Sequence, residues 1–155
     1  MSLRELHFDS FDQAIDEVNR LASGPTTTVG HYSHGQILEH LARALDMSLG
    51  KASPPKVGLP LRILGRLIRN MAIHKPMKPG FKLPKGAQDV LWPTEAVTVE
   101  QGMAHLIPSA AEFMASSELS PNPFFGKLTK EQHLQLQSRH FAMHLGFIYP
   151  SEDDS

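Results

Sequence analysis

The feature that most restricts the fold of this chain is a helix-start signal that occurs four times. At each place a Ser or Thr is followed three residues later by a Gln, and an apolar stripe of 3.6-residue period comes after it. In such a capping box the hydroxyl and the Gln side chain each bind a backbone N–H that the first helical turn leaves unpaired. The four pairs are Ser10–Gln13, Ser33–Gln36, Thr98–Gln101 and Thr129–Gln132.

These starts predict an all-α protein built as a four-helix bundle. The predicted helices cover about residues 10–22, 33–50, 98–115 and 129–148, and Pro108 is expected to kink the third of them. A shorter amphipathic helix is expected at 61–72, inside a long crossover rich in Pro, Gly and Lys. No convincing strand is found. A chain of 155 residues suits one core, so residues 1–155 are predicted to form a single domain.

The amino-acid composition excludes several classes of function. The chain has no Cys, which excludes disulfides, thiolate zinc sites and cysteine nucleophiles. Its formal net charge of −1 argues against a general nucleic-acid binder. No apolar run is long enough for integral membrane contact, and the first residues do not resemble a signal peptide. We therefore expect a cytoplasmic protein.

The chain has nine histidines, and two of them lie four residues apart on the last predicted helix. His140 and His144 share one helix face, about 6 Å apart along the axis, so both imidazoles can reach one metal ion. The alternative is a pair of partly exposed histidines on an amphipathic helix. His40, in the second helix, is by itself interpreted as a core-edge histidine bonded to a backbone carbonyl or to a side chain. It would complete a three-histidine site if the two helices are neighbours. His34 is a weaker reserve ligand.

Two stretches resemble the DinB/YfiT-like superfamily, whose members are described as metal-dependent enzymes. They are Ser33-x-Gly-Gln-Ile-Leu-x-His40-Leu and Pro123-Phe-Phe-Gly-Lys-Leu-Thr before His140-x-x-x-His144. The second lead-in is similar to a branch known only as a domain of unknown function. The resemblance implies an up-down-down-up bundle with His40, His140 and His144 as metal ligands. It also implies nickel or zinc and, for some relatives, transfer of groups to low-molecular-weight thiols.

The residues around the histidine pair depart from that branch. Its members often carry another histidine and an Arg-Gln after the pair, whereas this chain has Met143 before His144 and Gly146-Phe147 after Leu145. The three ligands that the resemblance implies are intact, but the polar residues that those relatives carry beside the pair are missing here. Candidates for a general acid or base are identified by residue type alone: Glu39, Glu112 and His133.

Three functions are consistent with these features. The first is a divalent-metal-dependent enzyme, a hydrolase or a low-molecular-weight-thiol-dependent transferase acting on a small molecule. The second is a bundle without catalysis, a binding or stress-response module that forms a homodimer. The third is a peripheral protein that meets anionic membranes through the basic segment 61–85, although a solvated helix packed on the bundle is the commoner form of such a segment.

Overall fold

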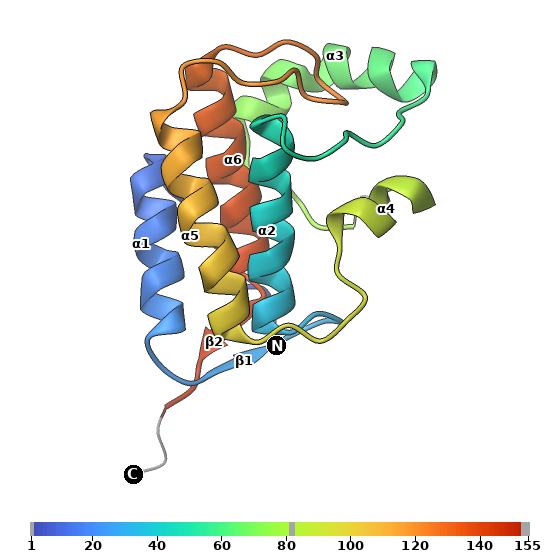
Figure 1. Ribbon diagram of the computed structural model, residues 1–155. Helices are drawn as coiled ribbons and strands as arrows, with labels where there is room; N and C mark the ends of the chain where they lie inside the picture. The colour runs from blue at the N-terminus through green and yellow to red at the C-terminus, as the bar shows by residue number, and fades with distance from the viewer. Residues whose placement is uncertain (1, 81–82, 153–155) are drawn as a thin grey trace.

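The structure is a computed structural model that describes residues 2–80 and 83–152, and within these the chain forms six helices and one pair of short strands (Figure 1). This confirms an all-α class. Among the described residues, no helix is long and apolar enough to cross a bilayer. The elements are α1 (Phe11–Ala22), β1 (Thr26–Thr28), α2 (His34–Ser48), α3 (Leu59–His74), α4 (Lys85–Leu91), α5 (Val99–Ala115), α6 (Lys130–Leu145) and β2 (Ile148–Pro150).

The predicted helix starts are all present, and three of them are complete capping boxes, at the beginning of α2, α5 and α6. The start of α1 differs. The Ser10 hydroxyl accepts a hydrogen bond from the Gln13 N–H, but the Gln13 side chain accepts one from the N–H of Asp9, at 2.9 Å. The Gln side chain therefore reaches one residue beyond the N-cap, and the helix still begins where it was predicted to begin.

Helices α1, α2, α5 and α6 lie side by side, with α3 across one end and α4 at the side (Figure 1). Helices α2 and α5 run in one direction, and α1 and α6 run in the other. The buried apolar core lies between these four helices. Phe11 of α1 meets Phe113 of α5 and Phe141 of α6 edge to face, with ring centroids 5.2 and 5.1 Å apart. This aromatic contact joins three of the four helices.

Helices α2 and α5 approach each other closely because both carry a glycine at their contact. A Cβ placed on Gly102 of α5 would lie 2.7 Å from the Cβ of Leu38 and 2.9 Å from the carbonyl oxygen of Gly35, both on α2. Such distances are shorter than a methyl group tolerates. Pro108 lies inside α5, which continues to Ala115.

The expectation of a last helix reaching residue 148 is wrong. Helix α6 ends at Leu145, and Ile148–Pro150 pairs antiparallel with Thr26–Thr28, a segment expected to be an irregular link. Arg4 binds the end of α6, since its side chain donates to the carbonyl oxygens of Leu145 and Ile148 at 3.1 and 2.6 Å. Three-residue strands carry too little alternation to be recognised, and this pairing joins opposite ends of the chain.

The long crossover contains two helices rather than one. Helix α3 extends beyond the predicted 61–72 at both ends, and α4 begins at Lys85, within a stretch expected to be irregular. Lys82, which belongs to the basic segment 61–85, lies outside the described residues. Helix α4 has only 7 residues and includes Gly86, so neither length nor composition signals it. Its importance is positional, because it places Leu91 and Trp92 beside α2.

Candidate metal centre

Three histidines from two helices meet at one point. The Nε2 atom of His40, on α2, lies 3.1 Å from the Nε2 atom of His140 and 3.1 Å from that of His144, both on α6. One ring nitrogen from each lies within 4.8 Å of the others, so the group could hold a metal ion. Zinc–nitrogen bonds of about 2.0–2.1 Å at tetrahedral angles separate two ligand nitrogens by about 3.3 Å. The observed spacing therefore fits one ion bound by the three rings.

Hydrogen bonds on the far side of two rings orient them toward this point. The Nδ1 atom of His40 lies 3.0 Å from the carbonyl oxygen of Leu91, which can only accept, so Nδ1 carries the proton and Nε2 presents a lone pair. The Nδ1 atom of His140 lies 3.4 Å from Oε1 of Gln137. Outer hydrogen bonds of this kind fix the tautomer and the direction of metal-binding imidazoles.

An aromatic stack fixes the plane of His40. The rings of His40 and Trp92 are parallel within 3°, with centroids 3.7 Å apart, and Tyr32 stacks on the opposite face of Trp92 at 3.8 Å. Trp92 also meets His144 edge to face at 5.3 Å. Trp92 thus contacts a histidine from each helix and restricts where the two rings can move.

The environment keeps the three imidazoles neutral. Burial lowers the pKa of His140 to about 4. Burial, followed by the proximity of His140, lowers the pKa of His40 well below its ordinary value, and the bond with Leu91 opposes this only in part. Burial, followed by the other two histidines, lowers the pKa of His144 in the same way. Only a neutral imidazole has a lone pair to offer a metal, so these shifts favour ligation at neutral pH.

A cavity of about 1230 Å³ opens beside the cluster, and all three histidines line it. Its wall is mainly apolar, with Gln137 next to the histidines and Lys75 and Lys78 among the polar lining residues. A ligand in this cavity could reach the ring nitrogens of the three histidines. The apolar wall includes Ile37, Leu64, Ile68, Met71, Trp92 and Met143.

None of the three acid or base candidates from the sequence joins the cluster. Glu39 binds Arg43 at 2.9 Å, Glu112 pairs with Lys51, and His133 is buried but does not line the cavity. The reserve ligand His34 is also apart, because its Nδ1 atom lies 2.8 Å from the Thr26 hydroxyl.

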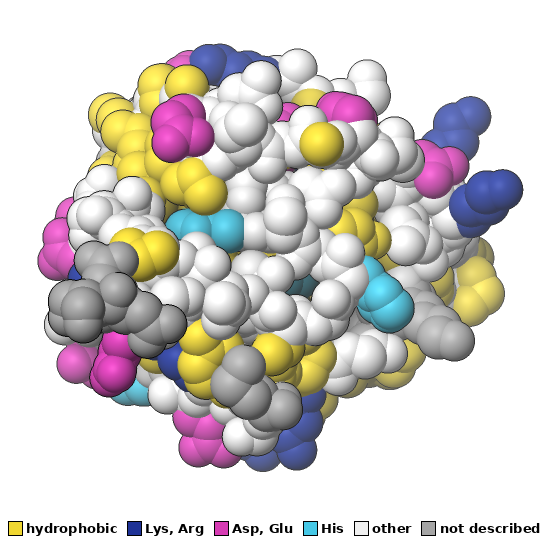
Figure 2. Space-filling view, turned by 90° about the horizontal axis from the view of Figure 1, so that it is seen from below, with side chains coloured by type: hydrophobic (Ala, Val, Ile, Leu, Met, Phe, Trp, Pro, Cys, Tyr) yellow, Lys and Arg dark blue, Asp and Glu magenta, His cyan; other side chains and the backbone are white. Residues whose placement is uncertain are grey.

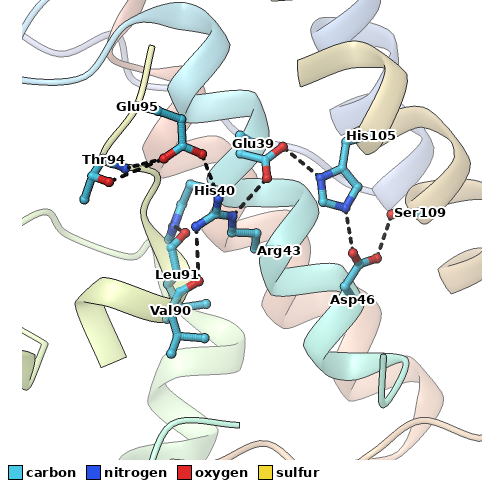
Figure 3. A network of polar contacts seen from close by, with 10 residues as sticks. All are labelled: Glu39, His40, Arg43, Asp46, Val90, Leu91, Thr94, Glu95, His105 and Ser109. Atoms are coloured by element: carbon cyan, nitrogen blue, oxygen red, sulfur yellow. Dashed lines mark hydrogen bonds and ion pairs between the residues drawn. The ribbon is translucent and has the colours of Figure 1, made fainter. Parts of the chain in front are cut away.

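A separate polar network occupies the contact between α2 and α5 (Figure 3). The ring of His105 lies between two carboxylates, with Nδ1 2.8 Å from Glu39 and Nε2 2.6 Å from Asp46. The Ser109 hydroxyl donates to Asp46 at 2.7 Å, so Ser109 is not activated by His105 as a nucleophile would be. Burial alone would lower the pKa of His105, but the bonds with Asp46 and Glu39 outweigh burial and raise it. This network joins the two helices.

Sequence reasoning missed Gln137, Trp92 and Tyr32. Gln137 had a recognisable signal, since it precedes His140 by three residues and His144 by seven and so lies on the same helix face. The positions of Trp92 and Tyr32 depend on how α4 and the segment before α2 pack. No local pattern in the sequence indicates that packing.

The fold and the cluster define a helical protein with three converging histidines at the wall of an apolar cavity. The chain belongs to the family described as protein of unknown function (DUF1569), whose pattern matches residues 1–151. Neither curated proteins nor solved structures provide a match.

Proposed function

We propose that this chain is a divalent-metal-dependent enzyme of DinB-like fold that acts on a small molecule. His40, His140 and His144 are its metal ligands, and nickel or zinc is the ion, since imidazole suits both. Helices α1, α2, α5 and α6 are the four members of an up-down-down-up bundle. The directions of these helices in Figure 1 support this assignment. One observation carries the proposal: three Nε2 atoms converge at the wall of an apolar cavity.

The reaction we propose is hydrolysis or transfer to a low-molecular-weight thiol. A divalent ion on three neutral imidazoles lowers the pKa of a bound water or thiol. The protein supplies the surroundings of that step. Apolar walls exclude bulk water from the cavity and bind the apolar part of a substrate, while Gln137 and Leu91 hold two of the rings in place.

Metal content tests the ligand set. Untagged protein should contain about one divalent ion per chain by mass spectrometry, in line with a site of three imidazoles. His40→Ala, His140→Ala and His144→Ala should each abolish binding while leaving the helical circular dichroism unchanged. His74→Ala, which removes an exposed histidine of α3, is the matched control. Stoichiometric metal in the three cluster variants would refute the site.

A second candidate is a metal-binding module without catalysis, acting as a homodimer in binding or stress response. It is favoured by the absence of Glu39, Glu112 and His133 from the cluster. The two proposals differ in whether the ion keeps a position open to a substrate. Cobalt-substituted protein should develop a thiolate charge-transfer band with 2-mercaptoethanol if that position is open. An unchanged spectrum would favour the non-catalytic module.

A further inference from the structure

The charges of this chain are strongly segregated along the sequence. Between Asp46 and Asp89 there are nine Lys and Arg residues and no Asp or Glu. The rest of the chain therefore holds only six of the 15 basic residues but all 16 acidic ones. The formal net charge of the whole chain, −1, does not reveal this segregation. The basic segment includes the whole of α3.

Helix α3 also exposes an apolar stripe. Leu59, Ile63 and Leu67 follow one another at four-residue intervals and are 65, 52 and 78% exposed. None of the three lines the cavity, whereas the exposed Leu64 and Met71 of the same helix do. The stripe of Leu59, Ile63 and Leu67 is thus a separate surface. Packing α3 against the rest of the molecule leaves this stripe uncovered.

The position of α3 suits contact with a flat surface. It lies across one end of the four core helices (Figure 1). It is held there by close backbone contact, because a Cβ on Gly65 would lie 2.1 Å from the carbonyl oxygen of Phe124. The opposite end of the molecule, which Figure 2 shows, carries acidic and basic side chains intermixed. Among the described residues, five of the six large hydrophobic side chains with high exposure belong to α3, and this helix carries no acidic residue.

We propose that α3 docks this protein onto the surface of an anionic lipid bilayer. The helix lies in the plane of the interface, with Leu59, Ile63 and Leu67 inserted at the boundary between headgroups and acyl chains. The exposed Arg62 and Arg66 lie beside the stripe and meet lipid phosphates. Each basic side chain close to such a surface contributes about a fivefold gain in binding. This docking does not depend on the metal site.

Charge and apolar exposure together favour an anionic bilayer over two other partners, a second copy of this chain and nucleic acid. An isologous contact between two copies would place two basic segments against each other without an acidic residue from either segment to offset them. Nucleic acid would satisfy Arg62 and Arg66 but would leave Leu59, Ile63 and Leu67 in water. An anionic bilayer satisfies both the charge and the apolar stripe.

Vesicle sedimentation tests the proposal. Wild-type protein should sediment with vesicles of phosphatidylcholine containing about one third phosphatidylglycerol, and not with phosphatidylcholine alone. Because the Debye length falls from about 10 Å at 0.1 M salt to about 3 Å at 1 M, binding should weaken strongly as salt is raised. Ile63→Ser with Leu67→Ser should weaken partitioning about tenfold or more, since two large apolar side chains no longer enter the interface.

The control is Ala104→Ser with Ala111→Ser, which places two hydroxyls at exposed positions of α5. It should bind vesicles as the wild type does. Equal binding to both lipid compositions, no binding to either, or full binding by the α3 double variant would overturn the proposal. Light scattering tests whether the stripe is instead a contact between two copies of the chain. If the wild type is a dimer and the α3 double variant is a monomer, the proposal fails.

Discussion

Gln137 contacts the ring of His140, one of the three proposed metal ligands. Its Oε1 atom is 3.4 Å from Nδ1 of His140, and its side chain is buried beside the cavity. Removing an outer hydrogen bond of this kind weakens metal affinity by about 10–100-fold. Gln137→Ala should show that loss for zinc in a chelator competition. Gln135→Ala, whose side chain contacts Glu131 instead, should bind zinc as the wild type does. Equal affinity in both variants would show that Gln137 does not position His140.

The two carboxylates around His105 should make the free energy of unfolding depend on pH. The pKa of His105 is raised in the folded state and returns to about 6.5 on unfolding, so folding favours the proton on His105. The resulting stabilisation is complete below the unfolded pKa and is lost as the pH rises through the folded pKa. In urea unfolding, the stability advantage of the wild type over His105→Gln should therefore be larger at about pH 6 than at about pH 9. His74→Gln controls for loss of a histidine from the surface. An advantage that grows with pH would contradict the bridging role.

At the scale of elements, the contact between α2 and α5 depends on the absence of a side chain. Gly102→Ala would press a methyl group against Leu38 and the backbone of Gly35, and such overpacking costs about 1–3 kcal/mol. The loss should appear as a lower urea midpoint with an unchanged slope. Gly86→Ala in α4 is the control, because nothing lies within 4 Å of its Cβ position. A Gly102→Ala variant as stable as the wild type would mean that the two helices can separate without cost.

Elements were predictable where their causes are local. Each capping box satisfies backbone groups within one turn, so the Ser/Thr and Gln pairs located the helix starts. The end of α6 was not predictable in this way. It depends on Arg4 and on pairing with β1, both far away in sequence. Helix α4 is stabilised by burial of Ala87 and Leu91 rather than by a cap, since it has no side-chain cap.

At the scale of the whole molecule, the candidate site was likewise predictable only where its causes are local. His140 and His144 could be paired from helical spacing alone, whereas adding His40 required two helices to be neighbours, which came from a resemblance and not from local chemistry. The surroundings of the three histidines were missed because they combine α2, α6 and the end of α4. The stacking of Trp92 on His40 produces no periodic pattern in the sequence.

The proposed ion would connect parts of the chain that are far apart, so its effect should extend to the whole molecule. His40 and His140 are separated by 100 residues, and an unfolded chain does not hold their Nε2 atoms together. An ion that binds only the folded state stabilises it by about 2.7 kcal/mol at a hundredfold excess over its dissociation constant. For a chain of this length that corresponds to a rise in Tm of roughly 5–10 °C. Calorimetry with added zinc or nickel should show this rise in the wild type and none in His144→Ala. If both proteins gain equally, the ion binds elsewhere, and the three histidines do not connect α2 to α6 through a metal.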